Sequence, residues 1–204
     1  IEMPAERLRR AIMDVGIGFL FAPRFHSSMK YVAPARMQLK IRTVFNILGP
    51  LVNPAAPRFQ VVGVSSPELM ELMINALHGL GIEYAFVVHG HNGMDEISIS
   101  GPTQVMELRR EEVRQFAINP QDFGMTPAPL KALFGGDAAV NAKIIEGVLQ
   151  GEPGPRRDVV VLNAAAAIVA AGGTTTWKGA IRAAQESIDS GAAHKKLQQL
   201  RQFV

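Results

Sequence analysis

The sequence predicts an α/β protein with a central mixed, mainly parallel sheet flanked by helices. Two short apolar runs, Phe59 to Val64 and Tyr84 to His89, have the length of buried strands, and an amphipathic stretch from Pro67 to Leu80 lies between them. A strand, a helix and a second strand within about 30 residues form a crossover unit with parallel strands. Two further helical stretches, residues 157–171 and 174–190, can cover such a sheet.

The first element is a helix that begins at Pro4 and continues to about Val15, where Gly16 ends it. Residues 22–54 follow, and four prolines and a glycine interrupt regular structure there. Proline fixes its own φ and disfavours helix at the residue before it, so we expect a stiff, irregular backbone. Binding sites usually lie on backbone of this kind.

After the crossover unit, residues 95–108 alternate apolar and polar side chains. This pattern predicts a hairpin that turns at Gly101-Pro102 and lies at the edge of the sheet. Residues 127–133 form a connection, and Asp137 then caps a helix that continues to about Gln150.

The C-terminal part is predicted to be helical. A turn at residues 151–155 precedes the mostly apolar helix of residues 157–171. Threonines 174–176 cap an amphipathic helix that ends near Ser190, and a polar helical tail follows. We find no repeat and no linker, so we expect one domain over residues 1–204.

Composition excludes several classes of protein. The hydrophobic content of 48% excludes disorder, and the absence of cysteine excludes disulfides and cysteine-ligated zinc, which fits the cytoplasm where we expect the protein. The longest nearly apolar run, residues 159–171, is well short of the roughly 20 residues that a bilayer span needs. The net charge is only +3 and aromatics make up 6%, so we expect no nucleic-acid partner and no membrane partner.

Residues 22–54 carry the most specific pattern, A-P-R-F-H-S-S-M-K-Y-V-A-P-A-R-M-Q-L-K-I-R-T-V-F-N-I-L-G-P-L-V-N-P. Together with Gly18 to Phe21, this segment resembles the anthranilate phosphoribosyltransferases of tryptophan biosynthesis. Their pattern reads approximately G-F-L-F-A-P-x-x-H-x-x-M-K, then V-x-x-R, then R-T-x-F-N-x-L-G-P-L-x-N-P. The D-E pair in G-M-D-E-I-S and the L-N-A-A-A-A run, Leu162 to Ala167, extend the resemblance over essentially the whole chain.

The resemblance implies the C-terminal α/β domain of a nucleoside phosphorylase/phosphoribosyltransferase-like fold. It also implies a glycosyltransferase that moves a phosphoribosyl group from phosphoribosyl pyrophosphate to anthranilate, giving N-(5-phosphoribosyl)anthranilate and pyrophosphate, with Mg²⁺ as cofactor. Family members carry an upstream helical segment, a G-T-G-G-D loop and a K-H-G-N stretch that this chain lacks. We therefore expect the C-terminal part of a longer homodimeric enzyme, without about the first two fifths, and whether this part alone is active stays open.

The resemblance assigns anthranilate binding to Arg36, His26, Met29, Gly49 and Pro50. A guanidinium offers the planar bidentate hydrogen bonds that the carboxylate of anthranilate accepts, although an isolated arginine more often pairs with a surface acid. The histidine either hydrogen-bonds the substrate or packs its ring against it. Met29 also suits a core position, and Gly49-Pro50 a simple turn.

Asp95 and Glu96 are adjacent acids shortly after Gly93. Mg²⁺ retains water and takes one or two carboxylates plus phosphate oxygens, so two neighbouring acids in a loop can hold it against a pyrophosphate. A solvated acidic turn is the ordinary alternative, and the resemblance favours the metal site. His89 and His91 have a spacing that only weakly suggests metal binding, and we expect a polar strand end instead.

No residue is an evident general base, so the catalytic residues stay unknown. Asn163, in the L-N-A-A-A-A run, is expected to cap or hydrogen-bond buried backbone. Two other functions remain open on this fold: a non-catalytic homologue that binds nucleic acid, and a pyrimidine nucleoside phosphorylase, whose own characteristic motifs are absent here.

Overall fold

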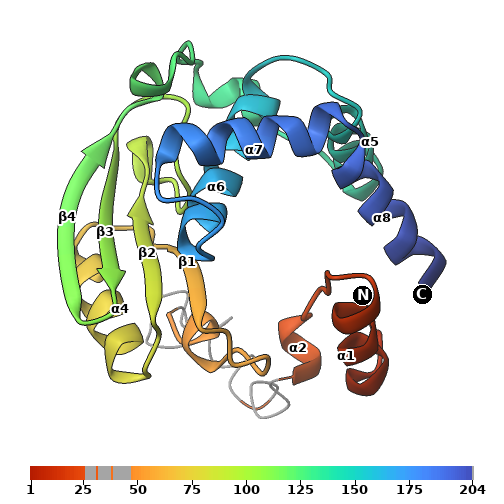
Figure 1. The fold of residues 1–204 in the computed structure, drawn as a ribbon, viewed down its shortest axis with the longest axis horizontal. Helices are drawn as coiled ribbons and strands as arrows, with labels where there is room; N and C mark the ends of the chain where they lie inside the picture. Colours follow the sequence, from red (N-terminus) through yellow and green to blue (C-terminus); the bar gives the residue numbers. More distant parts are fainter. Residues whose placement is uncertain (26–30, 32–37, 39–46, 204) are drawn as a thin grey trace. The chain divides into compact units, whose positions relative to one another are not determined.

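The computed structural model describes residues 1–25, 31, 38 and 47–203. The chain divides into two compact units, one of Ile1–Ala55 with Ala192–Val204 and one of Ala56–Gly191 (Figure 1). The expectation of a single domain over the whole chain stays a prediction.

The larger unit is built on a four-stranded sheet in the order β1 (Phe59–Gly63), β2 (Tyr84–His89), β3 (Thr103–Arg109) and β4 (Glu112–Ile118) (Figure 1). Strands β1 and β2 are parallel, and the other two neighbouring pairs are antiparallel. The predicted mixed α/β class is therefore confirmed. Within the described residues, however, the parallel pair is one of three, so this sheet is not mainly parallel.

Both faces of the sheet are covered. Phe86 and Val88 of β2 join a core with α6 (Pro155–Ala170) and α7 (Trp177–Asp189). Ala85 and Val87 point to the opposite face and are equally buried. Helix α4 (Glu68–Gly79), which connects β1 to β2, contacts β2 and β3 and buries four apolar side chains, namely Met70, Met73, Ile74 and Leu77.

The hairpin predicted for residues 95–108 is wrong. Residues 95–101 form an irregular loop, and the hairpin consists of β3 and β4, with Arg110-Glu111 as its turn. The alternating pattern has a different cause, because Ile97 and Ile99 point from this loop into the core, where each is at most 1% exposed. Strand β4 is an edge strand of this sheet and is largely exposed.

The helices of the C-terminal half follow the prediction. The Asp137 carboxylate caps α5 (Ala138–Leu149) by accepting a hydrogen bond from the Val140 amide at 2.9 Å. The Thr176 hydroxyl accepts from the Gly179 amide at 3.2 Å and caps α7. Short 3₁₀ turns complete the connections of the larger unit, namely His91–Gly93, Pro120–Phe123 and Leu130–Leu133.

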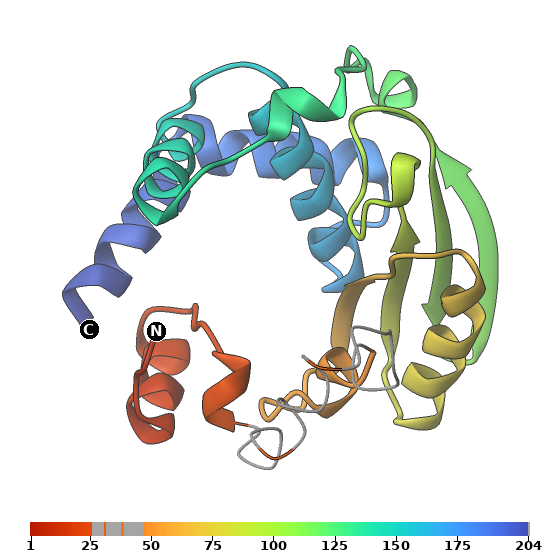
Figure 2. The same cartoon turned by 180° about the vertical axis from the view of Figure 1, so that it is seen from behind.

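The smaller unit contains α1 (Ala5–Asp14), α2 (Ala22–Phe25), the 3₁₀ turn Gly49–Val52 and the C-terminal α8 (Ala192–Phe203) (Figure 2). Two long-range hydrogen bonds connect its first and last segments. Arg7 Nη2 donates to the Phe203 carbonyl at 2.8 Å, and Lys196 Nζ donates to the Val15 carbonyl at 2.6 Å. Among the described residues of either unit, no helix combines the length and the apolar character needed to cross a bilayer.

Candidate functional site

The two parallel strands end side by side, because the strand register pairs Gly63 of β1 with Val88 of β2. In open α/β sheets, ligands bind just beyond the carboxyl ends of parallel strands. The loop of residues 90–101 begins at this edge and carries Asp95 and Glu96. The predicted acidic pair therefore lies in a loop that leaves the carboxyl end of β2.

Two glycines let the backbone of this loop approach the strand ends. A Cβ on Gly63 would overlap the Asp95 carbonyl and lie 3.0 Å from the Asp95 Cα, and a Cβ on Gly90 would overlap the Glu96 carbonyl oxygen. The Gly90 amide also donates to the Met94 carbonyl at 2.7 Å, in an isolated antiparallel bridge. A larger side chain at either glycine would force the strand end and the loop apart.

Helix α6 holds the loop from the other side. Asn163 Oδ1 accepts from the Ile97 amide at 2.9 Å, and Asn163 Nδ2 donates to the Ile97 carbonyl at 2.9 Å. The same Nδ2 also donates to the Val159 carbonyl at 2.9 Å. The prediction that Asn163 hydrogen-bonds buried backbone is confirmed, and that backbone directly follows Glu96.

The two carboxylates themselves reach outward. Asp95 and Glu96 are exposed, whereas the next three residues are buried. Although Glu96 is exposed overall, its pKa is raised above its usual range, first by partial desolvation of the carboxylate and second by the neighbouring charge of Asp95. A divalent cation would relieve this repulsion. Within the described part of the chain no cluster of three or more Asp, Glu, His or Cys side chains that could hold a metal ion occurs. Two neighbouring carboxylates can hold a Mg²⁺ that takes its other ligands from water and phosphate.

The histidines at the end of β2 and at the start of this loop have structural partners. His89 Nδ1 lies 2.9 Å from the Val64 carbonyl, and because a carbonyl only accepts, the histidine donates. The His91 ring packs against Gly101, where a Cβ would lie 2.7 Å from the His91 Cγ. This arrangement fits the predicted polar strand end.

The raised pKa of Glu96 gives a prediction for pH dependence. Mg²⁺ needs the ionised carboxylate, so we expect its affinity to fall on acidification at a higher pH than an ordinary glutamate would give. The Glu96→Gln variant should lose this part of the pH profile. Titration calorimetry with Mg²⁺ and pyrophosphate between about pH 4 and 8 measures both proteins. A profile that is the same in the variant would contradict the prediction.

The raised pKa of Glu96 also affects the free energy of unfolding of the metal-free protein. The effect has the opposite sign to that of an acid whose pKa is lowered by a salt bridge. The folded chain holds the Glu96 proton more tightly than the unfolded chain does. This contribution to stability is therefore fully present below the pKa of the unfolded chain and is lost as the pH rises through the folded-state pKa.

The residues predicted to bind anthranilate are only partly described. Gly49 and Pro50 begin the 3₁₀ turn of the smaller unit, and a Cβ on Gly49 would meet no atom of the described residues within 4 Å. Arg36, His26 and Met29 lie outside the described residues. The roles of all five stay predictions.

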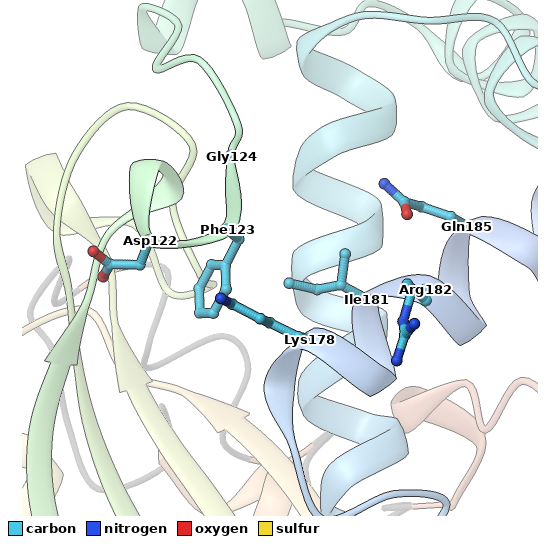
Figure 3. Close-up of a pocket in the computed structure, with 7 residues that line it drawn as sticks. All are labelled: Asp122, Phe123, Gly124, Lys178, Ile181, Arg182 and Gln185. Atoms are coloured by element: carbon cyan, nitrogen blue, oxygen red, sulfur yellow. The ribbon is translucent and has the colours of Figure 1, made fainter.

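A separate hollow of about 610 Å³ lies between α7 and the turn that follows β4 (Figure 3). The exposed cations Lys178 and Arg182 stand one turn apart on α7, and Ile181 and Phe123 contribute apolar surface. The Asp122 carboxylate accepts from the Asn119 amide at 2.7 Å and points away from α7 (Figure 3).

The sequence analysis did not single out the residues of this hollow, which are Asp122, Phe123, Gly124, Lys178, Ile181, Arg182 and Gln185. Two cations at this helical spacing indicate no more than a solvated helix face. The acidic loop is the stronger candidate site, because its backbone is fitted closely against Gly63 and Gly90 at the strand ends.

Comparison with known proteins gives a consistent result. Residues 1–194 match the family described as "Glycosyl transferase family, a/b domain". The anthranilate phosphoribosyltransferase of Symbiobacterium thermophilum is 48% identical over 204 residues, which are 100% of this chain and 60% of that protein. The chain therefore spans about three fifths of the length of this curated relative.

Solved structures agree in fold. The crystal structure of anthranilate phosphoribosyltransferase from Thermus thermophilus matches with a TM-score of 0.92 and 43% identity, over 98% of this chain and 59% of that one. The enzyme from Saccharomyces cerevisiae in complex with PRPP and Mg matches with a TM-score of 0.89 and 32% identity, over 99% of this chain and 58% of that one.

Proposed function

Because this chain belongs to the glycosyl transferase family whose a/b domain it matches, we propose that it supplies the anthranilate-binding and magnesium-binding part of an anthranilate phosphoribosyltransferase. Its substrates would be anthranilate and phosphoribosyl pyrophosphate, and its cofactor Mg²⁺. The observation that carries the proposal is the Asp95-Glu96 pair. Its backbone is fitted against the strand-end glycines Gly63 and Gly90, in a chain 48% identical to an enzyme of that name.

The chemistry asks for charge stabilisation and orientation. As the bond between ribose C1 and the pyrophosphate oxygen breaks, positive charge grows on the ribose and negative charge on the leaving group. Asp95 and Glu96 would hold Mg²⁺, which supplies positive charge to the pyrophosphate when bound. Arg36 would hydrogen-bond the carboxylate of anthranilate and so orient the neutral amine of this substrate toward ribose C1, which is catalysis by positioning. The sequence offers no evident general base.

The test is the decay of anthranilate fluorescence with phosphoribosyl pyrophosphate and Mg²⁺. It should be run on this chain and on a form extended at its N-terminus by the portion that the relatives have. Turnover in the extended form supports the proposed activity, and its absence from the shorter chain shows that the N-terminal portion is required. Absence of turnover in both folded proteins would favour a non-catalytic homologue.

The other two candidate functions gain no support from the comparisons, because the relatives are named anthranilate phosphoribosyltransferases. Phosphorolysis of thymidine or uridine would identify a nucleoside phosphorylase, and salt-dependent binding of DNA would identify a nucleic-acid-binding homologue. A homodimeric assembly and a cytoplasmic location remain part of the proposal.

Replacing Arg36 with alanine in the extended form should weaken the use of anthranilate far more than the use of the phosphoribosyl donor. The variant loses the bidentate hydrogen bonds to the substrate carboxylate, while the contacts to pyrophosphate remain. Steady-state kinetics with each substrate varied in turn gives the two kcat/KM values. Equal losses for both substrates would remove the assigned role of Arg36.

A further inference from the structure

We propose that Asn163 is a positioning residue of the magnesium site, and that it determines where Asp95 and Glu96 stand although it touches neither metal nor substrate. This inference rests on the proposed function, because it concerns the same acidic pair. Asn163 lies on α6, 66 residues further along the chain than Ile97, whose backbone it hydrogen-bonds.

The contact fixes the backbone in one orientation. The Asn163 amide pairs with both the amide and the carbonyl of Ile97, as a neighbouring strand would do. Its second N–H is taken by the Val159 carbonyl at 2.9 Å. A flipped amide would put its oxygen against two carbonyls, so all three bonds exist only in the observed orientation.

The contact between Asn163 and Ile97 affects the position of Asp95 and Glu96, because these two residues connect two backbone positions that are each fixed by hydrogen bonds. On one side, the Met94 carbonyl accepts from the Gly90 amide at 2.7 Å. On the other side, Ile97 is bound by Asn163 and its side chain is 1% exposed in the core. Asp95 and Glu96 are the only two residues in between. If Asn163 releases Ile97, the backbone amide and carbonyl of Ile97 lose these hydrogen bonds, so this end of the span is held less tightly and we expect the spacing of the two carboxylates to loosen.

Asn141 provides a matched comparison, because it makes the same pair of bonds elsewhere. Asn141 Oδ1 accepts from the Gly136 amide at 2.9 Å, and Nδ2 donates to the Gly136 carbonyl at 3.0 Å, at the exposed start of α5. Replacing either asparagine with leucine removes a side-chain amide that hydrogen-bonds both the backbone amide and the backbone carbonyl of one residue. Only at Asn163 is that backbone adjacent to the acids.

The experiment measures the affinity of the chain for Mn²⁺ in the presence of pyrophosphate, by the loss of the free Mn²⁺ signal in electron paramagnetic resonance. We expect Asn163→Leu and Asn163→Asp to bind Mn²⁺ about 10- to 100-fold more weakly, the usual effect of removing a partner that orients a metal ligand. Asn141→Leu should bind as the unchanged chain does.

If the Asn163→Leu variant fails to fold, the Asn163→Asp variant still tests the inference. Aspartate has the same shape and still accepts from the Ile97 amide, but at neutral pH it cannot donate to the two carbonyls. Its added negative charge would by itself attract Mn²⁺, so a weaker affinity reports lost positioning rather than changed charge.

The outcomes separate the two proposals. Unchanged Mn²⁺ affinity in a folded Asn163 variant, with only a lower Tm, would make Asn163 a structural residue and overturn the inference alone. No Mn²⁺ binding by either the unchanged chain or its N-terminally extended form would overturn the metal role of Asp95 and Glu96, and the inference with it. Weaker binding in both Asn163 variants and normal binding in Asn141→Leu would support it.

Discussion

The double variant Asp95→Asn, Glu96→Gln should lose Mg²⁺-dependent pyrophosphate binding, and in the N-terminally extended form its kcat/KM should fall by at least about 10²–10³-fold. That range is the usual loss when one group that stabilises the charge of a transition state is removed. Both substitutions keep the shape of the side chains and remove only charge. The expected loss is large because the Mg²⁺ that these two acids would hold no longer offsets the negative charge on the leaving pyrophosphate.

Glu111 and Glu112 provide the control for this variant. They form a second adjacent acidic pair, at the β3–β4 turn, and changing both to glutamine alters the net charge by the same amount. Glu112 pairs with Arg114 at 3.1 Å, but both side chains are mostly exposed, so this pair contributes little to stability. Titration calorimetry with Mg²⁺ and pyrophosphate compares the two variants. Equal weakening in both would show a general effect of charge and contradict a site at Asp95 and Glu96.

The elements that the sequence predicts best are those with a strong local cause. The strand from Tyr84 to His89 has the predicted bounds, because a run of apolar residues between two covering layers leaves little choice of structure. The helix after Asp137 begins as predicted, because its cap is a bond between residues three apart. Local chemistry determines both elements.

The misplaced hairpin shows where the local signal misleads. Alternation at Ile97 and Ile99 indicates only that successive side chains point to opposite sides, which an extended loop over a core also does. The true turn contains Arg110 with φ near 60°, a conformation that glycine or asparagine usually supplies. The run R-R-E-E contains no residue typical of a tight turn, so the sequence does not indicate the β3–β4 turn.

The sequence identifies the two acids of the candidate site but not the tertiary contacts that position them. Asp95 and Glu96 stand out because they are adjacent and because the resemblance to the family points to this D-E pair. Asn163 was expected to bind backbone, but its partner lies 66 residues away and no local pattern identifies it. Gly63 offers a weak signal, since glycine inside a strand often marks close approach of another backbone. The identity of that backbone depends on tertiary contacts.

Gly63→Ala is the second variant for which we expect a large effect. A Cβ at this position would overlap the Asp95 carbonyl and lie 3.0 Å from the Asp95 Cα, and backbone on both sides leaves no flexible side chain to move away. Overpacking of this kind costs up to about 3 kcal/mol, and occasionally more. For a chain of this size, such a loss lowers the Tm by about 6–12 °C. Thermal unfolding followed by circular dichroism measures it.

The Gly79→Ala variant is the matched control. Gly79 is the last residue of α4, and a Cβ there would meet no atom of the described residues within 4 Å. Because alanine favours helix and restricts the unfolded chain, this variant should be as stable as the unchanged protein or slightly more stable. An equal loss of Tm in both variants would show that the overlap at Gly63 is not the cause.

Metal binding by the Gly63→Ala variant distinguishes two ways in which the loop can respond. If the loop moves away from β1 as the added methyl group requires, Asp95 moves with it and Mn²⁺ affinity falls together with Tm. If instead β1 shifts and the loop stays on its Asn163 contact, Tm falls alone. We expect both quantities to fall, because β1 is paired with β2 along its whole length and is harder to displace than an irregular loop. A lower Tm with unchanged Mn²⁺ affinity would show that the contact between Gly63 and Asp95 does not control the site.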